Sequence, residues 1–239
     1  MSRQEAEKII KGVLNTGRKT LLETEAKQLV SAWGIPVPQS TLIKRQEDIA
    51  VMVNNLTPPF VLKVVSPDIL HKSEAGGVIT GIKDVEGVNK AWAIMMGNFK
   101  EKVPQARIEG ILLEEMAPAG VEVIIGGLRD PQFGPAVMFG VGGIMVELMK
   151  DVSFRLAPLD KKEAYEMMKD LKGYPLLTGF RGSMPVDREN LVSIIIKFSD
   201  ILLEMDEIKE LEINPLLVYE KGAMAVDARV LLNSGKINK

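Results

Sequence analysis

The chain contains no cysteine and only one histidine, His71, among its 239 residues. Without cysteine it cannot form disulfides, thiolate nucleophiles, iron–sulfur clusters or cysteine zinc sites. One imidazole cannot supply the two histidines of an HExxH metal site, and most Ser-His-Asp arrangements cannot be built from a single histidine that has another role. Acid–base or phosphoryl chemistry therefore has to rest on carboxylates, lysine, arginine and His71.

Two further absences limit the kinds of partner. The 30 basic and 32 acidic residues give a formal net charge of −2, and no segment concentrates lysine or arginine as a nucleic-acid or polybasic membrane binder does. The apolar runs are far shorter than the ~20 residues that cross a bilayer, and the N-terminal stretch lacks the apolar part of a secretion signal. We therefore predict a cytoplasmic protein that binds neither nucleic acid nor membrane.

The residues that are present predict strands and helices in alternation. With 46% hydrophobic residues, the chain is long enough to bury a core in one large domain or two small ones. Helical spacing of apolar residues distinguishes the helices from apolar runs bounded by glycine and proline. The expected helices are residues 2–16, 23–33, 47–56, 84–102, 161–171 and 189–205. The expected strands are residues 41–44, 60–65, 77–83, 109–116 and 121–128, glycine-interrupted strands within 135–149, and a hairpin within 210–232.

A lysine interrupts one of the apolar strands. Lys63 lies in the run FVLKVV (60–65), with apolar residues on both sides. It is either an edge-strand lysine whose ammonium reaches water along a buried stem, or a cation held against phosphate oxygens. The strand alone does not decide between these interpretations.

Three polar residues interrupt the closing hairpin. Glu212 and Asn214 are two residues apart, so they share a face of their strand, and Asp227 can lie opposite them across the hairpin. Such a group of oxygen atoms suits Mg²⁺, which takes one or two protein ligands and completes its shell with water and phosphate. The alternative is that all three are solvated residues on the outer face of an amphipathic hairpin.

His71 lies in a polar, glycine-containing stretch, residues 66–77, that we expect to be a loop between two strands. A lone histidine in a loop is commonly an ordinary surface residue. This one follows two apolar residues, Ile69 and Leu70, that could anchor the loop. A neutral imidazole is a competent nucleophile toward phosphorus, and the neighbouring Lys72 favours the neutral form. His71 is therefore a candidate phosphoryl carrier.

Several short motifs follow one another along the chain in a recognisable order. They are VLK (61–63), AGGV (75–78), LLEEM (112–116), EINPL (212–216) and VDAR (226–229). In this order they resemble a known family, the ATP-grasp beta subunits of the succinyl-CoA synthetase superfamily. Three longer stretches are more specific: SPDILHKSEAGGV (66–78), RDPQFGPAVMFGVGGIMVELMKDVSFRLAPL (129–159) and TGFRG (178–182). Within that superfamily they resemble the beta subunits of the archaeal ADP-forming acetyl-CoA synthetases.

The resemblance implies an α+β protein with the ATP-grasp fold, in which two α+β lobes clamp a nucleotide between their sheets. We expect one lobe at residues 20–108, carrying the phosphohistidine loop, and the other at residues 1–19 and 109–239. The substrate nucleotide is ADP or ATP, and the cofactor is Mg²⁺. The implied contacts are Lys63 with the phosphates; Glu114, Glu115 and Met116 with adenine at the hinge; Glu122 with the ribose; and Asn214 and Asp227 with Mg²⁺.

The resemblance also implies a partner and a relay. A CoA-binding alpha subunit carries a first phosphohistidine, and the two subunits form an α2β2 heterotetramer. His71 matches the loop histidine that accepts this phosphoryl group and carries it to ADP, and Glu212 matches the acid that steadies the imidazole. Acyl-CoA and phosphate would be reached through the partner. The implied enzyme is an acid–thiol ligase, an ADP-forming acetate–CoA ligase.

Two other functions compete with this one. A beta subunit of the succinate-type CoA ligases would have a Gly-Arg-Gly-Lys phosphate loop, where this chain has Ile69, Leu70, His71 and Lys72; loop contacts to phosphate therefore cannot be copied from those enzymes. A non-catalytic, nucleotide-sensing ATP-grasp module would be expected to lose functional residues. The chain keeps the histidine and both proposed metal ligands.

Overall fold

A computed structural model describes residues 3–69, 72–142, 146 and 149–233. The chain forms two compact units, each built on its own antiparallel sheet. The small unit is Pro38–Pro118, and the large unit combines Met1–Val37 with Ala119–Lys239. The small unit is thus an insertion into the large one. These boundaries lie about ten to twenty residues further along the chain than the expected 20 and 108.

The small unit has a four-stranded sheet in the order β1-β4-β2-β3. Its strands are β1 (Ser40–Ile43), β2 (Phe60–Val65), β3 (Val78–Ile82) and β4 (Gly110–Glu115). Its helices are η1 (Gln46–Asp48), α3 (Ile49–Met52), η2 (Val53–Asn55) and α4 (Val85–Lys102). The expected helix at 47–56 is therefore three short turns. Because β4 pairs with both β1 and β2, residues up to Glu115 belong to this unit.

Helix α4 covers one face of the small sheet. It begins after Asp84, whose carboxylate accepts the Gly87 N–H at 2.7 Å and so caps the first turn. Its buried side chains recur at helical spacing and pack on alternate residues of β2. Phe60, Leu62 and Val64 face this core. The intervening residue, Lys63, therefore lies on the other face of the sheet.

The large unit has a six-stranded sheet, in the order β10-β8-β5-β6-β7 with β9 paired to β8. Its strands are β5 (Val121–Asp130), β6 (Gly134–Val141), β7 (Val152–Leu156), β8 (Ile208–Val218), β9 (Ala223–Ala225) and β10 (Ala228–Leu232). Its helices include α1 (Arg3–Asn15), α2 (Glu23–Ala32), α6 (Lys161–Lys169), α7 (Tyr174–Thr178) and α8 (Arg188–Glu204). Helices α1 and α2 join the core of this sheet, so residues 20–37 belong here and not to the small unit.

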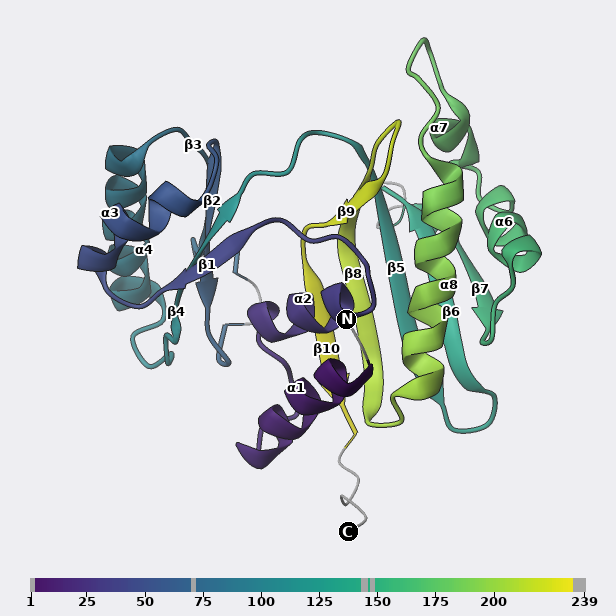
Figure 1. Cartoon of the computed structure of the whole chain (residues 1–239), viewed down its shortest axis with the longest axis horizontal. Helices are drawn as coiled ribbons and strands as arrows, with labels where there is room; N and C mark the ends of the chain where they lie inside the picture. Colours follow the sequence, from purple (N-terminus) through teal and green to yellow (C-terminus); the bar gives the residue numbers. More distant parts are fainter. Residues whose placement is uncertain (1–2, 70–71, 143–145, 147–148, 234–239) are drawn as a thin grey trace. The chain divides into compact units, whose positions relative to one another are not determined.

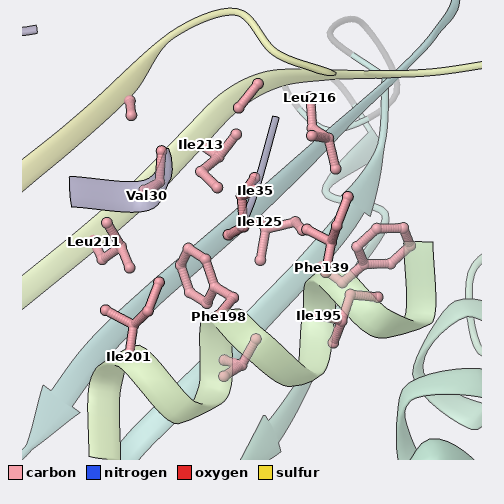
Figure 2. Packing of buried hydrophobic residues seen from close by; sticks show 14 of the residues in the cluster. Val30, Ile35, Ile125, Phe139, Ile195, Phe198, Ile201, Leu211, Ile213 and Leu216 are labelled. Carbon is pink, nitrogen blue, oxygen red and sulfur yellow. The ribbon is translucent and has the colours of Figure 1, made fainter. Parts of the chain in front are cut away.

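Helix α8 runs along one face of the large sheet (Figure 1). Figure 2 shows Phe198 and Ile201 of α8 among the buried side chains of the strands, including Ile125 and Leu211. The helix approaches closely at Gly127: a Cβ there would lie 2.7 Å from Phe198 Cε1 and would also collide with Leu202. A glycine at this position is what lets the helix and sheet meet.

The segment after β6 differs from the sequence prediction. Val146 donates its N–H to the Gly142 carbonyl at 3.2 Å, and Lys150 donates to the Val146 carbonyl at 3.1 Å. These bonds span four residues, which is the helical pattern, so the prediction of strands through residue 149 is wrong for this half. Gly142 ends β6 with a φ of 60°, a conformation that favours glycine. Strand β7, which follows, was not predicted.

Strand β5 is longer than expected. It continues through Arg129 and Asp130, where a turn was predicted at 129–131, and Asp130 pairs with Gly134. In the part of the chain that the structure describes, no helix combines the length and the apolar character needed to span a membrane.

Candidate functional site

Lys63 is held by an ion pair inside the small sheet. Its Nζ lies 3.1 Å from Oε1 of Glu114, and the two side chains are 7% and 1% exposed. The strand register explains the contact. Glu114 lies opposite Val61, and Val61 and Lys63 are two residues apart on β2, so the side chains of Lys63 and Glu114 share one face of the sheet as diagonal neighbours. Strand β2 has neighbours on both sides, so the interpretation of Lys63 as an edge-strand lysine reaching water is wrong.

The two residues after Glu114 close the end of β4. Glu115 accepts the Thr57 N–H on Oε1 at 2.7 Å and donates its own N–H to the Gln39 carbonyl. Met116 donates its N–H to the Pro59 carbonyl at 2.8 Å, and its side chain is 41% exposed. Both amide hydrogens are used within the small unit. A ligand held by the backbone here would therefore contact carbonyl oxygens.

The hairpin of the large unit brings three predicted residues together. Asn214 donates its side-chain Nδ2 to Oε1 of Glu212 at 3.2 Å and its backbone N–H to the Asp227 carbonyl at 3.1 Å. This confirms that Asp227 lies opposite the Glu212–Asn214 pair. Glu122 is exposed on β5 and pairs with Leu217, further along β8. It is therefore on the same sheet but apart from the group of three.

The chemistry of this group fits a magnesium site of the kind that relies on phosphate and water. Among the described residues, no three His, Cys, Asp or Glu side chains cluster in a way that could hold a metal alone. A carboxylate and an amide oxygen are nevertheless suitable Mg²⁺ ligands when a nucleotide supplies further oxygen atoms. The Asn214–Glu212 bond uses the amide nitrogen, so Asn214 would offer Oδ1 to a cation.

His71 lies outside the described residues, and so does Leu70. Their described neighbours are anchored on both sides. Ile69 is 7% exposed and belongs to the core of the small unit, and the Lys72 carbonyl accepts the Gly77 N–H at 2.7 Å. The expectation that Ile69 anchors this loop is confirmed.

One charged residue beside the group was not assigned a role from the sequence. Arg229 lies directly opposite Glu212 in the β8–β10 register. The signal was present in the sequence, because Arg229 is two residues after Asp227, the same spacing that Glu212 and Asn214 have on β8. Arg229 therefore places a positive charge opposite Glu212 in the large unit, as Lys63 does beside Glu114 in the small unit.

Comparison with known proteins places the chain in a family. Residues 12–232 match the model of an ATP-grasp domain. The chain is also 48% identical over 214 residues to the Pyrococcus furiosus protein "Acetate--CoA ligase [ADP-forming] I subunit beta", covering 90% of this chain and 92% of the relative. The chain belongs to the ATP-grasp beta subunits of the ADP-forming acetate–CoA ligases. The α+β ATP-grasp fold class and the resemblance found in the sequence are thereby confirmed.

Structures are known for other members of this family, and in some relatives the matching region is part of a longer chain. Two structures of Ca. Korarchaeum cryptofilum dinucleotide forming acetyl-coenzyme A synthetase 1 match with 46% and 45% identity and TM-scores of 0.89 and 0.84, each covering 95% of this chain and 100% of that chain. One contains a phosphorylated phosphohistidine segment, and the other contains Mg-AMPPCP, with its phosphohistidine segment pointing towards the nucleotide binding site. In "Acetate--CoA ligase [ADP-forming] I" from Archaeoglobus fulgidus, 38% identical, 97% of this chain matches only 34% of the relative.

Proposed function

We propose that the chain is the subunit that moves a phosphoryl group between a CoA-binding partner and ADP, with His71 as the carrier. The overall reaction converts acyl-CoA, ADP and phosphate to the free acid, ATP and CoA. One observation carries the assignment of the carrier: a relative 46% identical contains a phosphohistidine segment, and this chain has a single histidine. In the final step the N–P bond to His71 breaks, an O–P bond to the terminal oxygen of ADP forms, and the imidazole keeps the electron pair.

The role that we propose for Glu114 differs from the adenine contact that the resemblance implies. We infer that Lys63 neutralises the phosphate oxygens of the nucleotide. Glu114, only 1% exposed and 3.1 Å from Lys63, acts as a positioning residue for that ammonium instead of contacting adenine. Glu115 and Met116 remain the residues that line adenine, through side chains and carbonyl oxygens.

The remaining assignments concern the large unit. Asn214 and Asp227 would hold Mg²⁺, which when bound offsets the charge that spreads over the transferring phosphoryl group. Glu212 would steady the imidazole of His71, and its half-buried position opposite Arg229 leaves it partly open to another group. Glu122 would hold the ribose. These roles agree with the Mg-AMPPCP bound by the 45% identical relative.

The proposed partner is a CoA-binding alpha subunit, in an α2β2 heterotetramer. A subunit named beta in the Pyrococcus furiosus relative requires a second subunit, and the Archaeoglobus fulgidus relative carries additional polypeptide in one chain. Acyl-CoA and phosphate would then bind mainly to the partner. We place the complex in the cytoplasm, where ADP and acyl-CoA are available.

Labelling with radioactive phosphate tests the carrier. The chain is incubated with its alpha subunit, acetyl-CoA and labelled phosphate, and acid-labile label on the chain is measured for the wild type and for His71→Ala. We expect label only on the wild type, loss of overall turnover in the variant, and unchanged ADP affinity by calorimetry. Label on the variant, or equal loss of turnover and ADP binding, would rule out the relay. An unlabelled wild type would instead support a nucleotide-sensing module.

A further inference from the structure

One end of the predicted phosphohistidine loop forms a closed turn. Gly77 donates its N–H to the Lys72 carbonyl at 2.7 Å, and Gly76 donates its N–H to the Ser73 carbonyl at 3.0 Å. Both bonds join residues of the same short segment. Residues 72–76, which we call the carrier turn, can therefore keep their shape when the segment moves as a unit.

The carrier turn lies directly against helix α4 and strand β2. Gly76 has a φ of 70°, and a Cβ there would lie 2.6 Å from Nδ2 and 3.6 Å from Cβ of Asn98. Gly77 does not have a positive φ, but a Cβ there would lie 2.5 Å from Val64 Cγ1. Close approach, and not backbone conformation, therefore requires glycine at position 77. We call Asn98 and Val64 the seat of the carrier turn.

The other end of the loop is held more firmly. Ile69 is buried in the core of the small unit, and Oδ2 of Asp68 accepts the Arg107 N–H at 2.6 Å. Burial of an apolar side chain and a hydrogen bond to a charged group both stabilise this end. Ser73 and Glu74 of the carrier turn are exposed. The carrier turn is therefore the end that can move with the smaller loss of buried contacts.

Chain connectivity limits the reach of a carrier whose turn stays seated. Across a trans peptide, the Cα atom of residue 71 is one step of about 3.8 Å from that of Lys72. With the carrier turn seated, the imidazole stays within this step and one side-chain length of a fixed point. Because the two proposed active centres belong to different subunits, we expect them to lie further apart than this range.

We propose that the carrier turn is a hinged support for His71. It serves one active centre while seated on Asn98 and Val64, and it leaves the seat by rotation at the junction of Gly76 and Gly77 to serve the other centre. This inference rests on the proposed function. Two adjacent glycines allow the large changes of φ and ψ that a hinge requires.

The contacts on either side of the junction fit a hinge. The Gly77 carbonyl accepts the Val64 N–H at 2.8 Å, so the start of β3 stays attached to β2 while the turn moves. The bonds that close the carrier turn lie on the other side of the junction and move with it. Asn98 is then a positioning residue, because it acts on the carrier only through Gly76.

A reversible crosslink tests the hinge. In the double variant Gly76→Cys, Asn98→Cys the two Cβ atoms would lie 3.6 Å apart, within the range of about 3.5–4.5 Å found in disulfides. The chain has no other cysteine, so oxidation can form only this bond within it. Oxidation fixes the carrier turn to α4, and reduction releases it. The single variants, treated with the same oxidant, are the matched controls because neither can form the crosslink.

Two half-reactions that involve no thiol are measured. In the first, the chain takes label from γ-labelled ATP: an O–P bond of ATP breaks, the N–P bond to His71 forms, and ADP leaves. In the second, a chain labelled before oxidation passes its phosphoryl group to the histidine of the CoA-binding subunit of the same organism. We expect oxidation to slow one half-reaction at least about 100-fold and to leave the other within about threefold. Reduction should restore the slowed step.

The outcomes separate the hinge from the proposed function. A crosslinked chain that performs both half-reactions as well as the reduced chain would overturn the hinge. Loss of both would also overturn it, because the seated turn would then serve neither centre. A wild-type chain that takes no label from ATP would count against the proposed function instead.

Removing the seat gives a second measurement that needs no crosslink. Asn98→Ala should slow one half-reaction several-fold more than the other, because only one of them uses the seated turn. Ile94→Ala is the matched control, since Ile94 lies on the same helix and is 57% exposed. It should affect neither step. Equal rates for Asn98→Ala and the control in both half-reactions would remove Asn98 from the mechanism.

Discussion

The two units place their charged residues in opposite settings. In the small unit, Lys63 and Glu114 form an ion pair that is nearly inaccessible to solvent. In the large unit, the Glu212–Asn214 pair lies on an open sheet face. A buried pair is rigidly placed, but removing one partner leaves a charge that the surroundings cannot solvate. An open group contributes little to stability and can be rearranged by a ligand. Function and stability are therefore coupled in the small unit and separable in the large one.

The largest expected effect comes from breaking the buried pair. Lys63→Met leaves the Glu114 carboxylate buried without this ammonium, and should destabilise the small unit by about 3–5 kcal/mol. Hydrogen exchange of the β2 and β4 amides measures the loss. The double variant Lys63→Met, Glu114→Leu should recover most of it, since both members of the pair are then apolar. A loss below about 1 kcal/mol in the single variant would show that solvent reaches the pair and would remove the contrast between the units.

The two faces of the large sheet give the next effect. Gly127→Ala directs a methyl group at Phe198 and Leu202 and should cost about 1–3 kcal/mol by overpacking. Gly126→Ala, on the opposite face of the sheet, meets the flexible end of Met138 at 3.0 Å and should be nearly neutral. Urea unfolding of both variants provides the comparison. Equal losses would mean that the open face is packed as tightly as the covered one.

The start of α8 links stability to pH. The N–H groups of Gly222 and Asn190 donate to Asp187 and hold the pKa of its carboxyl below the usual range. Asp187→Ala should therefore cost about 1–2 kcal/mol at neutral pH. Because the folded pKa is lowered, this stabilisation is complete above the unfolded value of about 3.9 and is lost as the pH falls through the folded value.

Thermal unfolding from pH 7 to pH 3 checks the sign of this dependence. The difference between the wild type and Asp187→Ala should shrink at the acid end. Asp187→Asn keeps an acceptor without a titrating charge, so its stability should vary less with pH than that of the wild type. A difference that grows on acidification would contradict the assignment.

The smallest effect on stability is expected on the open face. Asn214 is exposed, so Asn214→Ala should change the free energy of unfolding by less than about 0.5 kcal/mol. The same change, like Asp227→Ala, should raise the Mg²⁺ concentration needed for half-maximal turnover. Unchanged metal dependence in both variants would remove these two residues from the proposed metal shell. A large loss of stability would show that Asn214 also supports folding.

Local patterns were sufficient for much of the fold and for one part of the site. The apolar run around Lys63 is a strand, and the period of two in the closing hairpin correctly placed Asp227 across from Asn214. Both depend on residues near each other in the sequence. The apolar run through Val146 was misread because periodicity alone does not separate a short buried strand from a helix when glycines interrupt it.

Long-range pairing accounts for the rest. The Lys63–Glu114 contact depends on the register of β2 with β4, which are separated by more than forty residues. The unit boundary near Val37 depends on where α1 and α2 pack, and nothing within those helices indicates it.

The insertion of the small unit also sets an order of events during synthesis. Helices α1 and α2 leave the ribosome early, yet Leu21 donates its N–H to the Val230 carbonyl, close to the last described strand residue. The apolar faces of these helices must wait for nearly the whole chain before their sheet exists, whereas residues 38–118 can fold as soon as they emerge. Nascent chains stalled before β10 should thus present α1 and α2 to chaperones while already carrying a folded insert.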